Sequence, residues 1–169
     1  MKYAGGLLVL VVLGILCMGC SNMPKEIDRE AEIAAVKAAI ETSITWCIPE
    51  KDRTKLYAHT LKDSSFFIFH PNSQSTIHSF DEFHDYAEGN FFDPRFKAVS
   101  SETREMRVNL SDCGDVAWFS CLLDDIGEWE GQKVGWINCR WTGVLVKKEG
   151  TWYLAQQHFS LPTDRPKEE

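Results

Sequence analysis

The side chains best suited to chemistry lie in the last third of the 169-residue chain, where a histidine, an arginine and two adjacent carboxylates stand among apolar residues. His158 is a candidate general acid or base, because an imidazole titrates near neutral pH, and a hydrogen-bonding contact to a ligand is its alternative role. Arg140 carries a planar guanidinium that suits a carboxylate or another anion, unless it forms an internal ion pair with Asp124 or Glu130. Asp124 and its neighbour Asp125 compete as the carboxylate nearest such a site, and both are also placed to begin a hairpin loop.

Other kinds of reactive site are not indicated. The histidines and cysteines lack the spacing of metal ligands, and no CxxC pair occurs, so we expect no metal. We also find no serine nucleophile elbow and no phosphate-binding loop, and we expect no cofactor. A formal charge of −7 without a basic cluster disfavours nucleic-acid binding.

Alternating apolar and polar residues after Arg95 predict four consecutive antiparallel strands. We expect these strands over Phe96–Leu110, Asp115–Asp124, Lys133–Lys147 and Thr151–Leu161. A type I turn over Lys148–Glu149, with Gly150 in a left-handed bulge position, would pair Thr142 with Gln156 and Arg140 with His158. A preceding turn near Trp129–Gly131 would bring Ser120 near Arg140 and Asp124 near Trp136; a one-residue change in that turn exchanges Asp124 for Asp125.

This register gathers polar and aromatic side chains on one face of the sheet, which grades from apolar at one end to polar at the other. Such a gradient predicts a pocket whose mouth is polar. The predicted ligand-binding residues are Trp118, Ser120, Trp136, Asn138, Arg140, Thr142, Gln156, His158 and Ser160.

The opposite face of the same strands is too apolar to be left in water. It would carry Phe119, Leu123, Ile137, Trp141, Leu145, Tyr153 and Phe159. With the helices assigned to the pocket side, a second copy of the sheet is the expected cover, which gives a homodimer. Cys121 and Cys139 would face each other here, either as a cross-strand disulfide or as two buried thiols.

Helical periodicity is confined to the first half of the chain. We expect helices over Glu26–Trp46 and Asp52–Leu61 and a third beginning at Ser79, with a short strand over Ser65–His70. The predicted fold class is therefore α+β, with three N-terminal helices packed on one face of a curled antiparallel sheet. One domain would span residues 26–162, and residues 163–169 form a disordered tail.

The N-terminus has the features of a bacterial lipoprotein export signal. Lys2 precedes an apolar run, and Gly19 stands directly before Cys20, the expected lipidation site; Cys17 is the alternative cysteine. Residues 1–19 would be the signal peptide and residues 20–25 a lipid-anchored linker, so the protein is expected in the cell envelope, outside the cytoplasm. Ser21 favours the outer membrane if the cell has one.

Three segments near the C-terminus resemble the SnoaL-like branch of the nuclear transport factor 2-like superfamily. They are GDVAWFS at Gly114–Ser120, RWT at Arg140–Thr142 and GTWYLAQQHFSLP at Gly150–Pro162. The resemblance implies a conical fold, a pocket at its wide end and frequent dimerisation. It does not imply one activity, because the superfamily includes isomerases, dehydratases and pure binding or assembly domains.

These features predict a lipid-anchored protein that binds a small amphipathic or anionic molecule through the cluster around Arg140. The alternative is a cofactor-independent isomerase or dehydratase. Its catalytic residues would be His158 or Asp124, since isomerases of this fold use a carboxylate to move a proton beside a carbonyl. A second alternative is an accessory domain whose sheet binds a protein partner.

Overall fold

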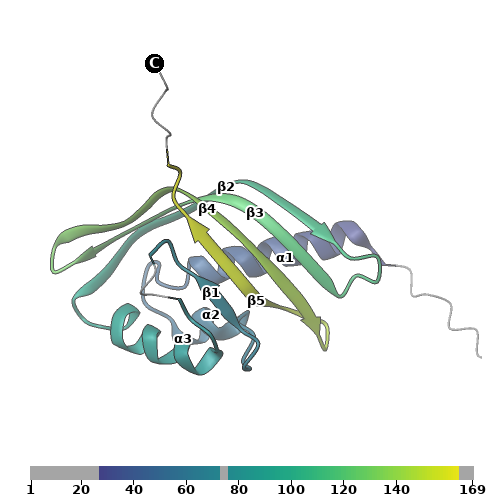
Figure 1. The fold of residues 1–169 in the computed structure, drawn as a ribbon, viewed down its shortest axis with the longest axis horizontal. Helices are drawn as coiled ribbons and strands as arrows, with labels where there is room; N and C mark the ends of the chain where they lie inside the picture. The colour runs from purple at the N-terminus through teal and green to yellow at the C-terminus, as the bar shows by residue number, and fades with distance from the viewer. Residues whose placement is uncertain (1–26, 73–75, 164–169) are drawn as a thin grey trace, which may run out of the picture.

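The computed structural model describes residues 27–72 and 76–163. A curled five-stranded sheet arches over three helices, which confirms the predicted α+β class (Figure 1). The predicted signal peptide and linker lie outside the described residues, as do residues 164–169 of the predicted tail.

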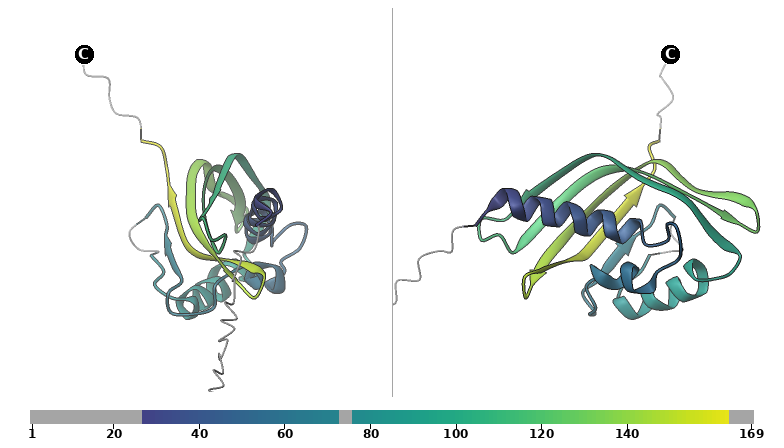
Figure 2. Two further views of the ribbon diagram at one scale, coloured as in Figure 1. Left: turned by 90° about the vertical axis from the view of Figure 1, so that its right-hand side faces the viewer. Right: turned by 180° about the vertical axis from the view of Figure 1, so that it is seen from behind.

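The longest helix, α1 (Arg29–Ile44), begins where the Asp28 carboxylate accepts a hydrogen bond from the Ala31 N–H. It runs along the concave side of the sheet (Figure 2, right). Its buried residues are Val36, Ala39 and Ile40. Val36 and Ile40 lie four residues apart and therefore on one side of the helix, as expected for a helix packed on a sheet.

Two shorter helices close one end of the sheet. Helix α2 (Arg53–Ala58) is capped by Asp52, and helix α3 (Phe80–Tyr86) begins at the predicted cap, where the Ser79 hydroxyl accepts from the Glu82 N–H at 3.2 Å. A single π-helical turn, η1 (Ala87–Phe91), extends α3 to the start of the sheet.

The sheet has the strand order β1-β5-β4-β3-β2. Its strands are β1 (Phe67–Phe69), β2 (Phe96–Leu110), β3 (Val116–Trp129), β4 (Gln132–Lys148) and β5 (Thr151–Ser160). Strand β1 pairs in parallel with β5, and the other neighbours are antiparallel. The β3–β4 hairpin reaches five residues beyond the predicted end of the second strand, because its two-residue turn lies at Glu130–Gly131.

The β4–β5 hairpin differs from the prediction. Its turn contains only Glu149 and Gly150, with φ angles of 51° and 83°, so Lys148 rather than Lys147 pairs with Thr151. Positive φ at both positions is typical of the two-residue hairpin turn whose twist matches that of the flanking strands. Together with one extra residue in β5, Ala155, this turn pairs Arg140 with Ser160 and Thr142 with His158, so the predicted pairing of Arg140 with His158 is wrong.

Two β-bulges then determine which side chains face the helices. In β5, Ala155 is unpaired between the Leu154 and Gln156 pairings, and in β4 two residues stand opposite Asp124 alone. The second bulge includes Asn138, whose φ is 55°. Each extra residue reverses the alternation of side chains along its strand. The residues that the sequence predicted on one face, graded from apolar to polar, therefore lie on two faces of the sheet: the face that the helices cover and the opposite, convex face.

The face predicted to await a second copy is the core. Most of its residues are buried on the helix side, in one cluster with Val36 and Ile40. They include Phe119, Leu123, Trp141, Leu145 and Phe159. Ile137 is instead 56% exposed, and Tyr153 is half-buried. Because the helices cover this face, it cannot be the predicted dimer interface.

Cys121 and Cys139 both belong to this core and are free thiols. Cys121 pairs with Trp141 and Cys139 with Leu123, so the two cysteines are diagonal neighbours rather than directly opposite. Of the two predicted states, the structure contains the buried thiols.

Candidate functional site

A cavity of about 250 Å³ lies at the end of the sheet that α2, α3 and the end of α1 close. Its lining is dominated by aromatic and aliphatic side chains, with a small number of polar groups among them. This composition is typical of sites for small molecules.

The sheet supplies the carboxylate of the cavity. Asp125 of β3 pairs directly with Trp136 of β4, and both residues line the cavity. Gly135 beside them has a φ of +116°, and a Cβ there would lie 2.0 Å from the Asp125 carbonyl oxygen. Only glycine allows the two strands this approach, which fixes the backbone that carries Asp125.

The cavity wall contains a belt of neighbouring rings. Successive ring centroids in this belt are separated by 5.2–6.0 Å. Trp141 is not part of the belt but stacks on its last ring, Phe159. In order, the belt is formed by Trp46, Phe91, Tyr86, His70, Trp136 and Phe159. These rings come from the loop after α1, from α3 and η1, and from the ends of β1, β4 and β5. The belt therefore exists only in the folded chain.

Burial raises the pKa of Asp125, because an ionised carboxylate is disfavoured in an apolar surrounding; a hydrogen bond from Ser101 Oγ to Oδ1 at 2.6 Å partly opposes this. A carboxyl group in such a cavity can accept a hydrogen bond or a proton from a ligand. His70, half-buried in the same lining, stacks on Phe159 at 5.7 Å. Two groups capable of proton exchange therefore share one cavity.

The thiol of Cys47 also lines this cavity. Burial, and after it the negative charge of Asp125, raise the pKa of Cys47 to about 11. Burial likewise raises the pKa of Tyr86. The thiol and the phenol are therefore neutral near pH 7 and can act as hydrogen-bond donors.

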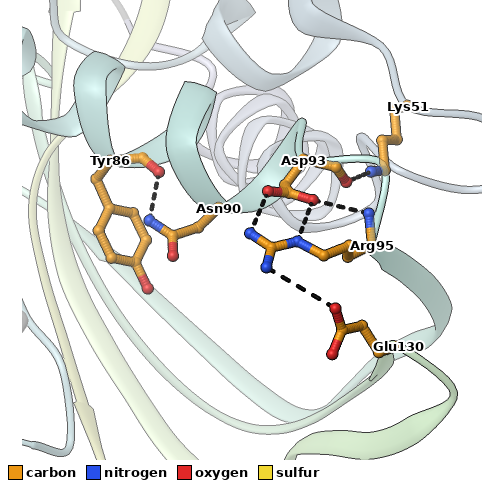
Figure 3. A network of polar contacts seen from close by, with 6 residues as sticks. All are labelled: Lys51, Tyr86, Asn90, Asp93, Arg95 and Glu130. Carbon is orange, nitrogen blue, oxygen red and sulfur yellow. Dashed lines mark hydrogen bonds and ion pairs between the residues drawn. The ribbon is translucent and has the colours of Figure 1, made fainter.

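A polar network holds the segment that carries Phe91 and Phe96, two rings of the lining. Figure 3 shows Arg95 bonded to Asp93 Oδ2 at 2.8 Å and directed towards Glu130 at 3.8 Å. The guanidinium also lies over the Trp129 ring, and hydrogen bonds from Arg95 lower the pKa of Asp93 to about 2. These contacts join the start of β2 to the tip of the β3–β4 hairpin.

The predicted site residues are largely on the other face of the sheet. Of the nine predicted ligand contacts, Trp136 lines the cavity; the remainder point away from it on the convex face. These are Trp118, Ser120, Asn138, Arg140, Thr142, Gln156, His158 and Ser160. Trp118 is 48% exposed, and Arg140 and His158 are also exposed. The structure does not bring Arg140 and His158 together with the cavity, because the bulges separate them from Trp136.

Asp124 is on the convex face as well. Its Oδ1 accepts from Arg104 at 2.8 Å and from the Asn138 N–H at 2.7 Å, and the latter bond is the main reason its pKa is lowered. The cation that pairs with Asp124 is thus Arg104, not Arg140. Between the two competing carboxylates, Asp125 is the one in the cavity.

Several lining residues were not predicted. Tyr86, Phe91 and Phe96 come from the end of α3, from η1 and from the start of β2, and Cys47 from the loop after α1. The only sequence signal was the density of aromatic residues around Phe91, which alone does not distinguish a cavity wall from a packed core. Within residues 27–72 and 76–163, no three His, Cys, Asp or Glu side chains gather as a metal site would require.

A helix-covered curled sheet with a cavity at one end defines a nuclear transport factor 2-like fold, and solved structures share it. One is a nuclear transport factor 2-like protein of unknown function from Pseudomonas putida KT2440, with a TM-score of 0.61 and 18% identity over 82% of this chain and 92% of that one. Another is a type 2 hexachlorocyclohexane dehydrochlorinase, LinA (TM-score 0.61, 14% identity, 78% and 86% covered). A third is the association domain of C. elegans CaMKII (TM-score 0.54, 19% identity, 79% and 95% covered).

At these identities the likeness establishes the fold alone. Residues 36–164 match the model of the SnoaL-like domain family, and the chain belongs to this family. No curated protein matches the sequence. Within the described ranges, no helix has the length and hydrophobicity needed to cross a membrane.

Proposed function

We propose that this protein is a lipid-anchored envelope protein that binds a small amphipathic molecule in the cavity beside Asp125. The observation that carries this proposal is the lining, in which a belt of rings surrounds a few polar groups. Burial of apolar ligand surface supplies affinity, and the polar groups fix orientation. An anionic ligand is disfavoured, because the cavity contains the Asp125 carboxylate and no lysine or arginine is among the described lining residues.

A cavity-filling variant tests this function. Ser43 lines the cavity, and Ser43→Phe places a ring inside it; Glu41→Phe adds the same ring at an exposed position of the same helix as the matched control. We expect small amphipathic compounds to raise the melting temperature of the parent and of Glu41→Phe, and not of Ser43→Phe. Equal responses from all three proteins would refute binding in this cavity.

A cofactor-independent proton-transfer enzyme is the second candidate. Its specific support is that Asp125 and His70 share an apolar cavity and that burial raises the pKa of Asp125, which suits a general base. These residues replace Asp124 and His158 in the role. The test is exchange of ligand C–H hydrogens in deuterated water: exchange that Asp125→Asn abolishes would support catalysis, and binding without exchange would leave the protein a binder.

We also propose a homodimer, now through the convex face rather than the helix-covered one. Phe69 and Trp118 are 49% and 48% exposed on this face, and they are apolar side chains that a second copy would cover. Light scattering should give twice the monomer mass at micromolar concentration, and Trp118→Glu should halve it. A monomeric parent would contradict this interface.

Lipid attachment is tested by a pair of cysteines in the N-terminal segment. Cells fed a labelled fatty acid should label the parent and Cys17→Ser, whereas Cys20→Ser should remain unlabelled and unprocessed. Labelling that survives Cys20→Ser would reject Cys20 as the anchor.

A further inference from the structure

The belt of rings and the carboxylate at Asp125 define more than an apolar pocket. We propose that the cavity is a site for an organic cation, specifically a methylated ammonium group. This inference rests on the proposed function, because it names the chemical class of the ligand that the cavity holds.

The first argument is the ring belt. Trp46, Tyr86 and Trp136 belong to it, and the faces of tryptophan and tyrosine rings attract a cation through their quadrupoles. Rings arranged around a cavity bind an alkylated ammonium from several sides at once. A neutral ligand of the same shape gains only the burial of its surface.

The second argument is that the cavity contains a carboxyl group but, among its described lining residues, no lysine or arginine. The two lysines whose charges act on this end of the molecule bond elsewhere: Lys51 Nζ donates to the Asp93 carbonyl and Lys55 Nζ to the Thr45 carbonyl, each at 2.7 Å. Asp125 Oδ1 accepts only a neutral donor, the Ser101 hydroxyl, among the hydrogen bonds of the described residues. A cationic ligand would supply the counter-charge that this buried carboxylate lacks.

The third argument concerns the substitution of the nitrogen. A primary ammonium carries three N–H donors, each of which needs an acceptor when it leaves water. The oxygen acceptors among the described lining side chains are few: those of Asp125 and Gln157, the Tyr86 phenol, and the hydroxyls of Ser43 and Thr60, which themselves donate to the carbonyls of Ile40 and Leu56. The rest of the described wall is largely made of rings and aliphatic side chains, which suit methyl groups. The lining therefore favours a tertiary or quaternary ammonium over a primary amine.

Calorimetric titration of the full chain in detergent at pH 8, where imidazole is neutral, tests the inference. The probes are choline and 3,3-dimethylbutan-1-ol, which has the same shape with carbon in place of the charged nitrogen. We expect choline to bind at least about tenfold more tightly than the alcohol. Asp125→Asn should abolish this preference, and Asp124→Asn, which removes the adjacent carboxylate on the convex face, should retain it.

The outcomes separate this inference from the proposed function. Equal affinity for both probes, or a preference that survives Asp125→Asn, would overturn the ammonium site and leave an amphipathic pocket intact. If neither probe binds while neutral aromatic compounds still stabilise the parent and not Ser43→Phe, the inference alone fails. If Asp125→Asn does not fold, Trp136→Leu decides: it should weaken choline several-fold more than the alcohol, and an equal loss for both would overturn the proposal.

Discussion

From the position of β5 we expect substitutions of two adjacent residues, Phe159 and His158, to have very different effects on stability. Phe159 is 6% exposed, stacks on Trp141 at 5.4 Å and on His70 at 5.7 Å, and contacts Trp136 at 5.2 Å. Its ring is therefore a shared wall of core and cavity. His158 points to the convex face, where it is exposed.

Phe159→Ala should lower the free energy of unfolding by about 3 kcal/mol. Burial of a phenylalanine contributes about 1.5–3 kcal/mol, and each well-placed ring pair adds about 0.5–1.5 kcal/mol. Phenylalanine-to-alanine changes in cores cost about 3–5 kcal/mol. We expect the lower end, because the vacated space joins an existing cavity rather than forming a new closed void. For a domain of this size the melting temperature should fall by about 10 °C.

Denaturant unfolding followed by far-ultraviolet circular dichroism measures this cost, with His158→Ala as the control. Substitution of the exposed histidine should change stability by about 0.5 kcal/mol or less. Similar losses for both variants, or a larger loss for His158→Ala, would show that the bulge at Ala155 does not place Phe159 inwards. That result would refute the assignment of the two sheet faces.

Three further predictions concern the carboxylate, a crowded glycine and the thiols. Because burial raises the pKa of Asp125, its ionisation opposes folding as the pH rises through that pKa. Asp125→Asn should therefore be more stable than the parent at pH 7, and this gain in stability should vanish below the ordinary pKa of 3.8. A loss of stability at pH 7 would contradict this reasoning. Gly143→Ala should lower the free energy of unfolding by about 1–3 kcal/mol, measured with denaturant, because the added Cβ would lie 2.5 Å from the Gln156 carbonyl oxygen and 2.7 Å from Phe119. An unchanged free energy of unfolding would show that the strands can separate. Of the four described cysteines, Cys113 is exposed and the other three are buried. A thiol reagent at pH 8 should therefore modify one of these four rapidly and the others only after unfolding. Rapid modification of two of the four would indicate that the core opens.

The order and type of the elements were determined by local sequence. Period-two alternation gave all four long strands, with β2 over Phe96–Leu110 as predicted, and Ser79 caps α3 as its spacing to Glu82 indicates. These features depend on residues that are neighbours in the chain, so a single sequence contains the information. The family resemblance of the C-terminal segments was likewise correct.

The residues of the cavity could not be predicted from local sequence in the same way. A turn of two residues instead of three and two bulges shift the register, and a shift of one residue moves every later side chain to the opposite face. Whether Ala155 is accommodated as a bulge depends on how Leu154 and Phe159 both reach the core, which is a property of packing. The choice between Asp124 and Asp125 followed instead from which face of β3 the helices cover, because Asp125 alternates regularly with the buried Leu123.

By itself, then, the sequence determined the fold class and the family, because these depend on composition, periodicity and short motifs; the export signal stays a prediction. Only the tertiary structure decided which face of the sheet the helices cover, and hence that Asp125, His70 and Trp136 share a cavity while Arg140 and His158 are on the convex face. The physical reason is that a β-strand has two nearly equivalent faces, and one unpaired residue exchanges them.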